Sequence, residues 1–457
     1  MTLRLAMVPF AALLAWGAEP QNSAIRFEDA TASSGIQFVH SFGARKLGSL
    51  LESTGSGCAW FDYNNDGLPD LYVASGRPLE GNIHPFPLRT PPATPPHNHL
   101  YRNDGNGKFT DVTDKAGVAT DLFSTAAIAA DYDNDGLEDL LVTGYGHVTL
   151  YRNKGNGTFE DATEKAGLKA PGWSIGSAWL DYDRDGCVDL FVGRYVKFDP
   201  TYRAYYAADN YPGPLDYAGQ TNLLFHNNCD GTFTDVSAKS GIAAHVGRTM
   251  GATAGDFDLD GYPDIYVAND KTENFLFRNN HDGTFKEIAL QAGVAFGQNG
   301  EATSAMGPVF VDLFNAGHID LWVTDSKYNR LWRNAGPAKF KDITESAGIA
   351  QLNAQYVSWG SVRLRFRQRR TTRYLHRSWR ADSSVPQEHP FSAMWEIWPV
   401  RGCFQRWRTV LRSKDGRTGR LLCRLRQRRE AGSVHGEPGS TRTSCTMFRR
   451  GAITGWP

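Results

Sequence analysis

Two short motifs alternate along this chain, and they constrain its fold more than any other feature. The first motif reads Asp-x-Asp/Asn-x-Asp-Gly-x-x-Asp and continues into an apolar run. Copies occupy residues 62–73, 131–142, 181–192 and 256–267, and a degenerate copy, DLFNAGHIDLWV, occupies 312–323. Sequence repeats separated by several tens of residues are typical of propellers, solenoids and other repeat architectures.

The second motif follows each copy of the first and contains two apolar stretches around a Gly-containing turn. Its copies occupy 100–118, 150–168, 224–242, 276–294 and 331–349. In one unit, the successive stretches STAAIAADY, DLLVTG, VTLYRN and TFEDAT each predict a strand, and KGNG predicts a hairpin turn. Four-stranded units repeated in sequence predict an all-β fold, a β-propeller with about five legible blades within residues 26–361.

The Asp-rich motif has the composition of a calcium-binding loop. Its oxygen-bearing side chains stand at positions 1, 3, 5 and 9, and Gly at position 6 permits a sharp turn, a spacing that suits Ca²⁺ better than the stricter geometry of Mg²⁺. Closely spaced carboxylates repel one another and favour a bound cation. The sequence therefore predicts up to four structural Ca²⁺ sites. The candidate ligands are Asp62, Asn64, Asp66, Asp70, Asp131, Asp133, Asp135, Asp139, Asp181, Asp183, Asp185, Asp189, Asp256, Asp258, Asp260 and Asp264.

The fifth copy of this motif is not expected to bind metal. Phe314 and Ala316 stand where positions 3 and 5 require oxygen atoms. Asp312 and Asp320 remain, and two carboxylates alone would hold a cation only weakly.

Two insertions interrupt the repeats, and in repeat proteins insertions map to loops on one face, often the binding face. One is the Pro-rich segment 77–97, and the other is the Tyr-rich segment 197–221. Tyrosines of the second insertion suit carbohydrate stacking or protein contact, although they could equally pack the insertion onto the propeller. These ligand-face candidates are Tyr202, Tyr205, Tyr206, Tyr211 and Tyr217.

The N-terminal segment 1–18 resembles a cleavable export signal. Arg4 is followed by an apolar run, Leu5 to Trp16, which is too short to span a bilayer, and small residues follow it. We therefore expect a secreted, periplasmic or cell-surface protein with no membrane span after cleavage. The cysteines before residue 362 are odd in number and irregularly spaced, so they give only weak evidence for disulfides.

The segment 362–457 differs in composition from the rest of the chain. It contains 22 Lys and Arg residues against 6 Asp and Glu, although the whole chain has a formal net charge of zero. Its segments FRQRR and LRQRR are what Phe-Asp-Asn-Asp-Gly becomes when its codons are read in a shifted frame. Decoded in that way, residues 363–377 give AFDFDNDGRPDIFIV and 424–439 give a further copy of the first motif. We therefore interpret 362–457 as an out-of-frame, Arg-rich tail that is irregular and disordered.

A frameshift would also account for the number of blades. The segment 26–36 matches the end of the second motif without its beginning, as a strand that closes a ring would. Two decoded copies added to the five visible ones predict a seven-bladed parent. The alternative, a basic tail that binds nucleic acid or an anionic surface, loses support because its Arg spacing follows the hidden codons, and no nucleic-acid partner is expected.

These motifs resemble the FG-GAP/VCBS repeats of integrin-type propellers. The opening segment GIQFVHSFGARKLGSLLESTGSGCAWFDYNNDG at 35–67 is more specifically similar to the ASPIC/UnbV, or cartilage acidic protein-like, family. The resemblance covers 26–361 and implies a calcium-stabilised extracellular binding protein without a known reaction.

The predicted function is a binding or adhesion scaffold without catalysis, with an extracellular protein or carbohydrate as its partner. The alternative is a polysaccharide lyase or hydrolase that uses the central pocket of the propeller, for which His40 and Glu52 are the residues to nominate. We find no nucleophile elbow, zinc-protease motif, phosphate-binding loop or dinucleotide-binding fingerprint.

Overall fold

The computed structural model describes the chain in several stretches. These are residues 29–38, 40, 49–77, 97–204, 212–336, 338–350 and 357–361, with the backbone of five strands further on. The expected export signal at 1–18 lies outside the described residues. Within the described part, no helix has the length and apolar character needed to span a membrane.

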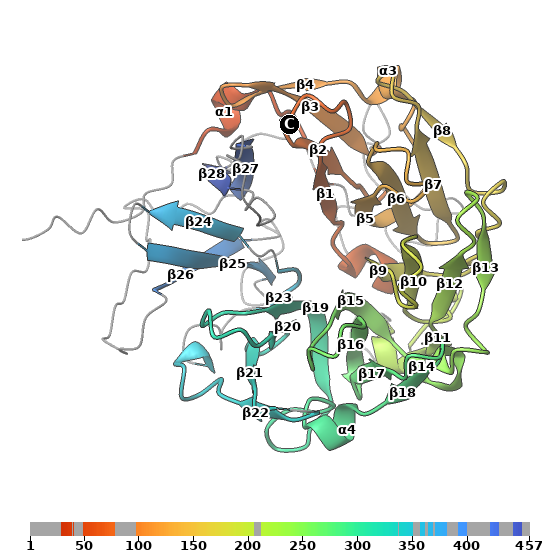
Figure 1. The fold of residues 1–457 in the computed structure, drawn as a ribbon, viewed down its shortest axis with the longest axis vertical. Coiled ribbons are helices and arrows are strands. Elements are labelled where there is room, and N and C mark those ends of the chain that lie inside the picture. The colour runs from red at the N-terminus through yellow and green to blue at the C-terminus, as the bar shows by residue number, and fades with distance from the viewer. Residues whose placement is uncertain are drawn as a thin grey trace, which may run out of the picture.

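Five antiparallel sheets of four strands succeed one another along the chain and are arranged around a ring (Figure 1). The first sheet contains β1 (Cys58–Phe61), β2 (Asp70–Val73), β3 (His99–Gly105) and β4 (Lys108–Asp111). The second contains β5 (Ser124–Ala130), β6 (Asp139–Gly144), β7 (Val148–Asn153) and β8 (Phe159–Asp161). The third contains β9 (Ser174–Leu180), β10 (Asp189–Arg194), β12 (Leu223–Asn227) and β13 (Phe233–Asp235).

The last two sheets are joined to each other. The fourth contains β15 (Thr249–Gly255), β16 (Asp264–Thr272), β17 (Phe275–Asn279) and β18 (Phe285–Glu287). The fifth contains β19 (Thr303–Val311), β20 (Asp320–Asp325), β21 (Arg330–Asn334) and β22 (Phe340–Asp342). The end of β16 pairs with the start of β19, so that the two sheets form one continuous ladder.

These sheets confirm the predicted all-β, propeller-like fold. In the second unit the strands coincide with the four stretches that the sequence indicated, and the first strand of each sheet lies nearest the centre of the ring (Figure 1). The second strands are apolar on both faces because neighbouring sheets cover them. Leu140 and Val142 of β6, for example, pack in one cluster with Phe61 and Tyr72 of the first sheet. The hydrophobic core therefore lies between the sheets.

Short helical elements and one small ladder complete the ring. The helices are α1 (Thr31–Ser34), α2 (Leu50–Ser53), α3 (Thr113–Ala116) and α4 (Ala289–Ala292), with 3-10 turns η1 (Pro214–Asp216) and η2 (Ile242–Ala244). The small ladder pairs β11 (Gln220–Thr221) with β14 (Val246–Gly247). Helices α3 and α4 follow the fourth strand of their units and end at Gly117 and Gly293, both in the left-handed region.

The prediction of an irregular tail is wrong for five stretches of its backbone. Strand β23 (Val357–Ser358) leads into β24 (Leu364–Gln368), β25 (Thr371–Ala381) and β26 (Ser392–Pro399), and β27 (Leu421–Arg428) pairs with β28 (Arg442–Arg449). These stretches contain Thr, Tyr, Trp, Phe and Met, which favour strands, and antiparallel pairing satisfies their backbone groups. They occupy the sector of the ring between the fifth and first sheets (Figure 1).

The antiparallel order of each sheet assigns its connections to two opposite faces of the ring. The Asp-rich loop joins the first strand to the second, and the hairpin turn joins the third to the fourth, so both emerge at one end of the sheet, here called the loop face. The connections β2–β3 and β10–β12, which carry the two insertions, leave from the other end, here called the insertion face.

Candidate metal sites

The five Asp-rich loops share one backbone turn. They are loop 1 (62–70), loop 2 (131–139), loop 3 (181–189), loop 4 (256–264) and loop 5 (312–320). In loop 4, Asp256 at position 1 accepts hydrogen bonds from the backbone N–H of Asp260 at 3.0 Å and of Gly261 at 2.9 Å. The carboxylate at position 1 accepts the equivalent pair in the other four loops. Position 1 therefore shapes the turn itself.

Two residues of each loop adopt left-handed backbone conformations. Position 6 is Gly in every loop, with φ of 81°, 86°, 91°, 93° and 78° in chain order. Position 4 also has positive φ, which Asn tolerates well but a branched side chain such as Leu259, with φ of 61°, does not. The Gly of the motif is thus explained by backbone geometry.

Position 9 is a buried carboxylate that fastens the loop to its sheet. Asp264 accepts hydrogen bonds from the N–H of Phe257 at 3.2 Å and of Asn279, at the end of β17, at 2.9 Å. Burial raises the pKa of Asp264 to about 8, and that of its counterpart Asp139 to about 7. A nearby cation would favour the ionised form and lower these pKa values.

Position 3 carries the observation that most favours a bound cation. The Oδ1 atoms of Asp133, Asp183 and Asp258 are all buried and have no hydrogen-bond partner among the described residues. The Asp258 side chain is only 4% exposed. A buried carboxylate oxygen without a partner is costly, and the same atom recurs in three loops, which is what a shared ligand position would leave when no ion is included.

Carboxylates gather around position 3 in loops 2, 3 and 4. One oxygen of each member lies within 4.8 Å of the others in the groups Asp131–Asp133–Asp139, Asp181–Asp183–Asp185 and Asp256–Asp258–Asp260. The donors are carboxylate oxygens, which suit Ca²⁺. The residues present therefore fit the predicted metal in these three loops.

Loop 1 differs because position 3 is Asn64. Its Nδ2 donates to Asp66 at 3.1 Å, and its Oδ1 accepts from the N–H of the same residue at 3.1 Å. The remaining candidates keep the common turn: Asp62 holds positions 5 and 6, and Asp70 accepts from the N–H of Tyr63 and Asn103. Loop 1 thus offers three carboxylates and one amide oxygen.

The sequence analysis did not identify the arginine that faces the loops. It stands in the third strand, in the Tyr/Phe-Arg-Asn part of the second motif. Arg278 donates from Nε to Asp258 at 2.7 Å, and Arg152 binds both Asp133 and Asp135. In the first sheet, Arg102 instead pairs with Asp104 at 2.8 Å. A guanidinium therefore neutralises part of the carboxylate charge in loops 2 and 4.

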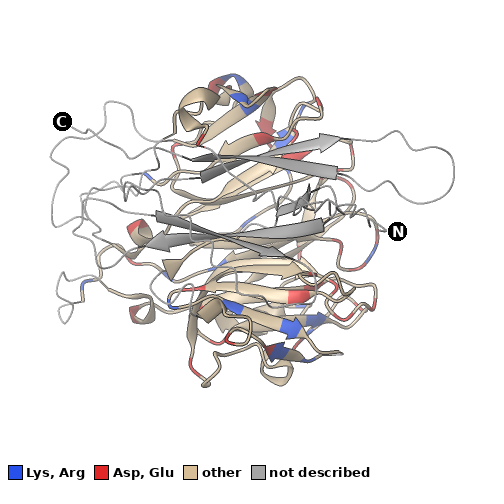
Figure 2. Cartoon of the chain, turned by 90° about the vertical axis from the view of Figure 1, so that its left-hand side faces the viewer, with Lys and Arg blue, Asp and Glu red and all other residues tan. Residues whose placement is uncertain are grey.

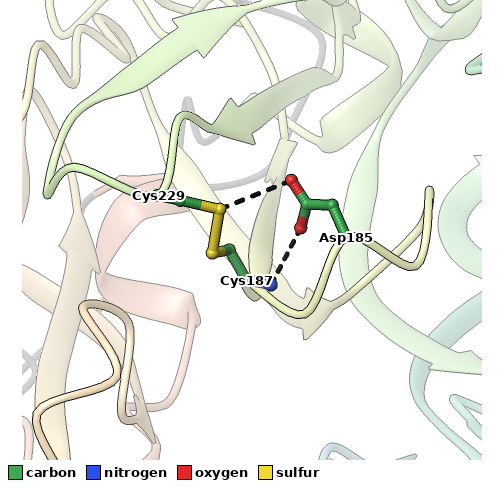
Figure 3. Close-up of side chains that lie close together, drawn as sticks. All are labelled: Asp185, Cys187 and Cys229. Atoms are coloured by element: carbon green, nitrogen blue, oxygen red, sulfur yellow. Dashed lines mark hydrogen bonds between the residues drawn. A yellow bond between two sulfur atoms is a disulfide. The ribbon is translucent and has the colours of Figure 1, made fainter.

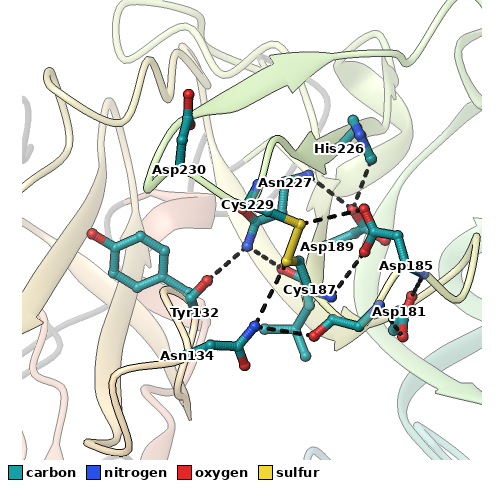
Figure 4. Close-up of a disulfide and its surroundings, with 12 residues drawn as sticks. Tyr132, Asn134, Asp181, Asp185, Cys187, Asp189, His226, Asn227, Cys229 and Asp230 are labelled. Carbon is teal, nitrogen blue, oxygen red and sulfur yellow. Dashed lines mark hydrogen bonds and ion pairs between the residues drawn. A yellow bond between two sulfur atoms is a disulfide. The ribbon is translucent and has the colours of Figure 1, made fainter.

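Loop 3 has a histidine in place of this arginine and a disulfide that sequence spacing did not predict. His226 Nδ1 lies 3.2 Å from Asp189 Oδ1 and 3.4 Å from Asp183 Oδ2. Cys187, at position 7 of the loop, is bonded to Cys229 in the β12–β13 turn, and Asp185 lies beside the bridge (Figures 3 and 4). In loop 4 the equivalent contact is a stack of Tyr262 on His281, with ring centroids 4.2 Å apart.

A second missed residue is the asparagine that ends each third strand. Asn279 Nδ2 donates to the carbonyl of Tyr182, in the loop of the preceding blade, at 2.8 Å, and to Pro263 in its own loop at 3.2 Å. Asn153, Asn227 and Asn334 bridge neighbouring blades in the same way (Figure 4). The invariant Asn of the five second motifs was the signal that could have identified this link.

The described tyrosines of the second insertion divide between the surface and the core. Tyr217 is 6% exposed and packs with Trp173 and Tyr195, whereas Tyr202 is 40% exposed and meets the edge of Tyr217. Tyr205, Tyr206 and Tyr211 lie outside the described residues. One tyrosine therefore anchors the insertion, and Tyr202 remains a candidate for ligand contact.

A pocket of about 310 Å³ opens near the insertion. It is lined by Arg194, Lys197, Gly219, Gln220, Thr221 and Val246. Arg194 Nη2 donates to Gln220 at 2.6 Å, while its Nε is buried and has no hydrogen-bond partner among the described residues. The pocket therefore offers cationic hydrogen-bond donors.

The residues nominated for the enzymatic alternative do not form a described catalytic arrangement. Glu52 lies on α2 and is fully buried, and His40 is partly buried. No interaction between them is among the described contacts. Seen from the side, the described part of the molecule carries basic and acidic residues interspersed (Figure 2).

Comparison with known proteins assigns the repeats. The sequence profile of the FG-GAP-like repeat matches residues 62–142, 131–192, 213–267 and 256–323, which together cover more than half of the chain. Human cartilage acidic protein 1 is 28% identical over 113 residues, which are 24% of this chain and 16% of that protein. The chain thus matches less than two thirds of this relative.

A search of solved structures gives distant similarities. One is to an Agrocybe aegerita lectin described as recognising non-reducing terminal N-acetylglucosamine. It is 14% identical, with a TM-score of 0.38, and the match covers 76% of this chain and 80% of the lectin.

Proposed function

The chain belongs to the FG-GAP-like repeat family, and from that premise we propose that it is an exported, calcium-stabilised propeller that binds an extracellular partner. The repeats supply a rigid ring, the Asp-rich loops would hold Ca²⁺ on one face, and the insertion face would carry the binding surface. In this proposal the metal ties loop to sheet and contributes folding free energy rather than catalysis.

The calcium assignment rests on the buried, unpartnered Oδ1 at position 3 of loops 2, 3 and 4. Asp133, Asp183 and Asp258 would each supply this oxygen, and positions 1, 5 and 9 would supply the others. Loop 1 would be a weaker site, because Asn64 replaces one carboxylate.

The binding role is supported by the chemistry of the insertion face. Tyr202 presents an exposed aromatic ring, and the nearby pocket presents Arg194 and Lys197. An aromatic surface beside cationic donors suits an acidic carbohydrate or an acidic segment of a protein. The described part of Cartilage acidic protein-like sequence similarity at 35–67 and the export-like segment 1–18 are consistent with an extracellular location.

We further propose that the reading frame changes just before Val362, and that the parent is a seven-bladed member of the ASPIC/UnbV family. The two decoded copies of the first motif support this proposal. Resequencing the gene across codons 350 to 380 tests it, because an unchanged frame would exclude the proposed parent.

The binding role can be tested with arrays of acidic and neutral polysaccharides and the full chain. We expect the variants Tyr202→Ala and Arg194→Gln to weaken retention of an acidic ligand. Leu290→Ala is the matched control, because Leu290 is exposed on α4, away from the pocket residues. Equal retention by all variants would contradict a ligand site on the insertion face.

A further inference from the structure

Loop 3 is chemically unlike the other loops because of His226. The third strands of the other four sheets carry Arg102, Arg152, Arg278 and Arg333 at the equivalent place. An arginine can only donate hydrogen bonds and keeps its charge, whereas a neutral imidazole offers a nitrogen lone pair to a metal ion.

The geometry around His226 is that of a compact ligand set. Its Nδ1 lies 3.2 Å from Asp189 Oδ1 and 3.4 Å from Asp183 Oδ2. Ligand atoms on a tetrahedral ion with bonds of 2.0–2.1 Å are about 3.3–3.4 Å apart. These three atoms could therefore bind one small divalent ion without a large rearrangement.

The surroundings hold two of these ligands in place. Asp189 is fully buried and accepts hydrogen bonds from the backbone N–H of Asn227 at 2.8 Å and of Tyr182 at 3.0 Å. Asp183 keeps a buried Oδ1 that has no partner among the described residues. Backbone donors that orient a ligating carboxylate are a common outer shell of metal sites.

Space for a further ligand lies in front of this cluster. A pocket of about 280 Å³ is lined by both Asp183 and His226, together with Tyr182, Val236, Lys239, His281, Asp282 and Gly283. In loops 2 and 4 an arginine side chain contacts the position-3 carboxylate instead. The shorter histidine leaves room, so a bound ion would keep a coordination position open to water or a ligand oxygen.

The sulfur atoms nearby do not contribute to this site. Cys187 and Cys229 lie close to Asp185, but they are joined in a disulfide and have no thiolate to offer (Figure 3). The donor set is therefore one imidazole nitrogen and two carboxylate oxygens. Imidazole ligands suit zinc and its first-row neighbours better than they suit calcium.

We propose that His226, Asp183 and Asp189 form a binding site for a divalent transition metal ion of the zinc class, distinct from the calcium sites of loops 2 and 4. The inference shares Asp183 with the proposed calcium loop 3, and to that extent it rests on the proposed function. It predicts that loop 3 prefers Zn²⁺ or Co²⁺ to Ca²⁺.

The test uses the full chain, stripped of metal by dialysis and then saturated with Ca²⁺. Zn²⁺ is titrated by calorimetry, and Co²⁺ is titrated by its visible absorption. We expect wild-type protein to bind Zn²⁺ at least about tenfold more tightly than His226→Arg, which carries the residue of the other repeats. His318→Asn is the control, because His318 is an exposed residue of loop 5, and it should bind like wild type.

A second variant guards against misfolding of the first. His226→Asn removes the ligand with a smaller side chain and should lose Zn²⁺ affinity in the same way. Equal Zn²⁺ affinity in wild type and whichever variant folds would overturn the proposal. Stabilisation by Ca²⁺, measured by thermal unfolding, reports separately on the calcium sites, so a failure of the calcium proposal would leave wild type and variants equally insensitive to Ca²⁺ while the Zn²⁺ comparison stands.

Discussion

Loops 4 and 5 lie in adjoining sheets and make the same turn with different chemistry. Asp256 and Asp312 both hold the turn through two backbone N–H groups. In loop 4 the third-strand arginine donates to Asp258, whereas in loop 5 the guanidinium of Arg333 lies over the ring of Phe314, 5.0 Å from its centroid. The turn is therefore independent of the metal ligands, and position 3 decides whether a cation can be held.

Removing calcium should have the largest effect on this comparison. A site that binds only the folded state stabilises it by about 2.7 kcal/mol when calcium is a hundredfold above its dissociation constant. We expect a chelator to lower the melting temperature of the full chain in circular dichroism, and Ca²⁺ to restore it. Identical melting curves with and without the chelator would remove calcium from the account, and Mg²⁺ serves as the control ion.

Next in size are matched substitutions at positions 3 and 1. Asp258→Asn should abolish about 2 kcal/mol of calcium-dependent stabilisation, because it removes a ligating charge. Asp312→Asn should cost about 1 kcal/mol with or without calcium, because it weakens only the turn. Urea unfolding in both conditions separates the two effects, and a calcium-dependent loss at Asp312 would mean that loop 5 still binds metal.

Rebuilding loop 5 tests whether position 3 is sufficient. The double variant Phe314→Asp/Ala316→Asp restores oxygen atoms at positions 3 and 5. It should be less stable than wild type without calcium, because its carboxylates repel, and should gain about 1–2 kcal/mol of calcium-dependent stability. Phe314→Ala/Ala316→Ser is the uncharged control. A rebuilt loop that ignores calcium would show that the arginine or the sheet also decides binding.

The buried acid of loop 5 should give a smaller, pH-dependent effect. Burial raises the pKa of Asp320 to about 6, so the folded state holds this proton more tightly than the unfolded state. Its contribution to stability is complete below its ordinary pKa and is lost as the pH rises through about 6. The free-energy gap between wild type and Asp320→Asn should therefore shrink by about 1–2 kcal/mol from about pH 4 to about pH 7. A gap that is constant across this range would contradict the raised pKa.

The smallest expected effect concerns position 4. Leu259 is exposed and has positive φ, as Asn315 does in loop 5. Leu259→Asn should stabilise the protein by about 0.5–1 kcal/mol, and Asn315→Leu should destabilise it by a similar amount. Thermal unfolding of both variants in calcium measures the pair, and a loss of stability in Leu259→Asn would show that the leucine packs usefully.

The sequence predicted the repeat units and their strands well, because both are written in local patterns. The apolar runs of β6 and β7 and the Gly-containing turn between β7 and β8 are examples. The position-9 carboxylate was expected to be a metal ligand, and its bonds to the backbone were not foreseen, since Asp264 meets Asn279 only after folding. The strands of the tail were also missed, because the argument from codons says nothing about the peptide as translated.

The loop partners could not be predicted because they come from other elements. Arg278 belongs to the third strand, and the Cys187–Cys229 bridge joins residues 42 positions apart. Spacing alone indicated no disulfide, since only the sheet brings position 7 of loop 3 against the β12–β13 turn. Repetition of Arg and Asn in the second motif marked these positions, and comparing the copies residue by residue would have revealed the substitution at His226.

The asparagine bridges give the ring a direction of assembly. Asn153, Asn227, Asn279 and Asn334 each reach back to a carbonyl of the blade that precedes it in the chain. During synthesis from the N-terminus, every new blade would therefore find its acceptor already made on the ribosome-distal side. Growth of the ring can then proceed as a stepwise templating process, in which each blade is the mould for the next and a coding change beyond the fifth leaves the earlier joints intact.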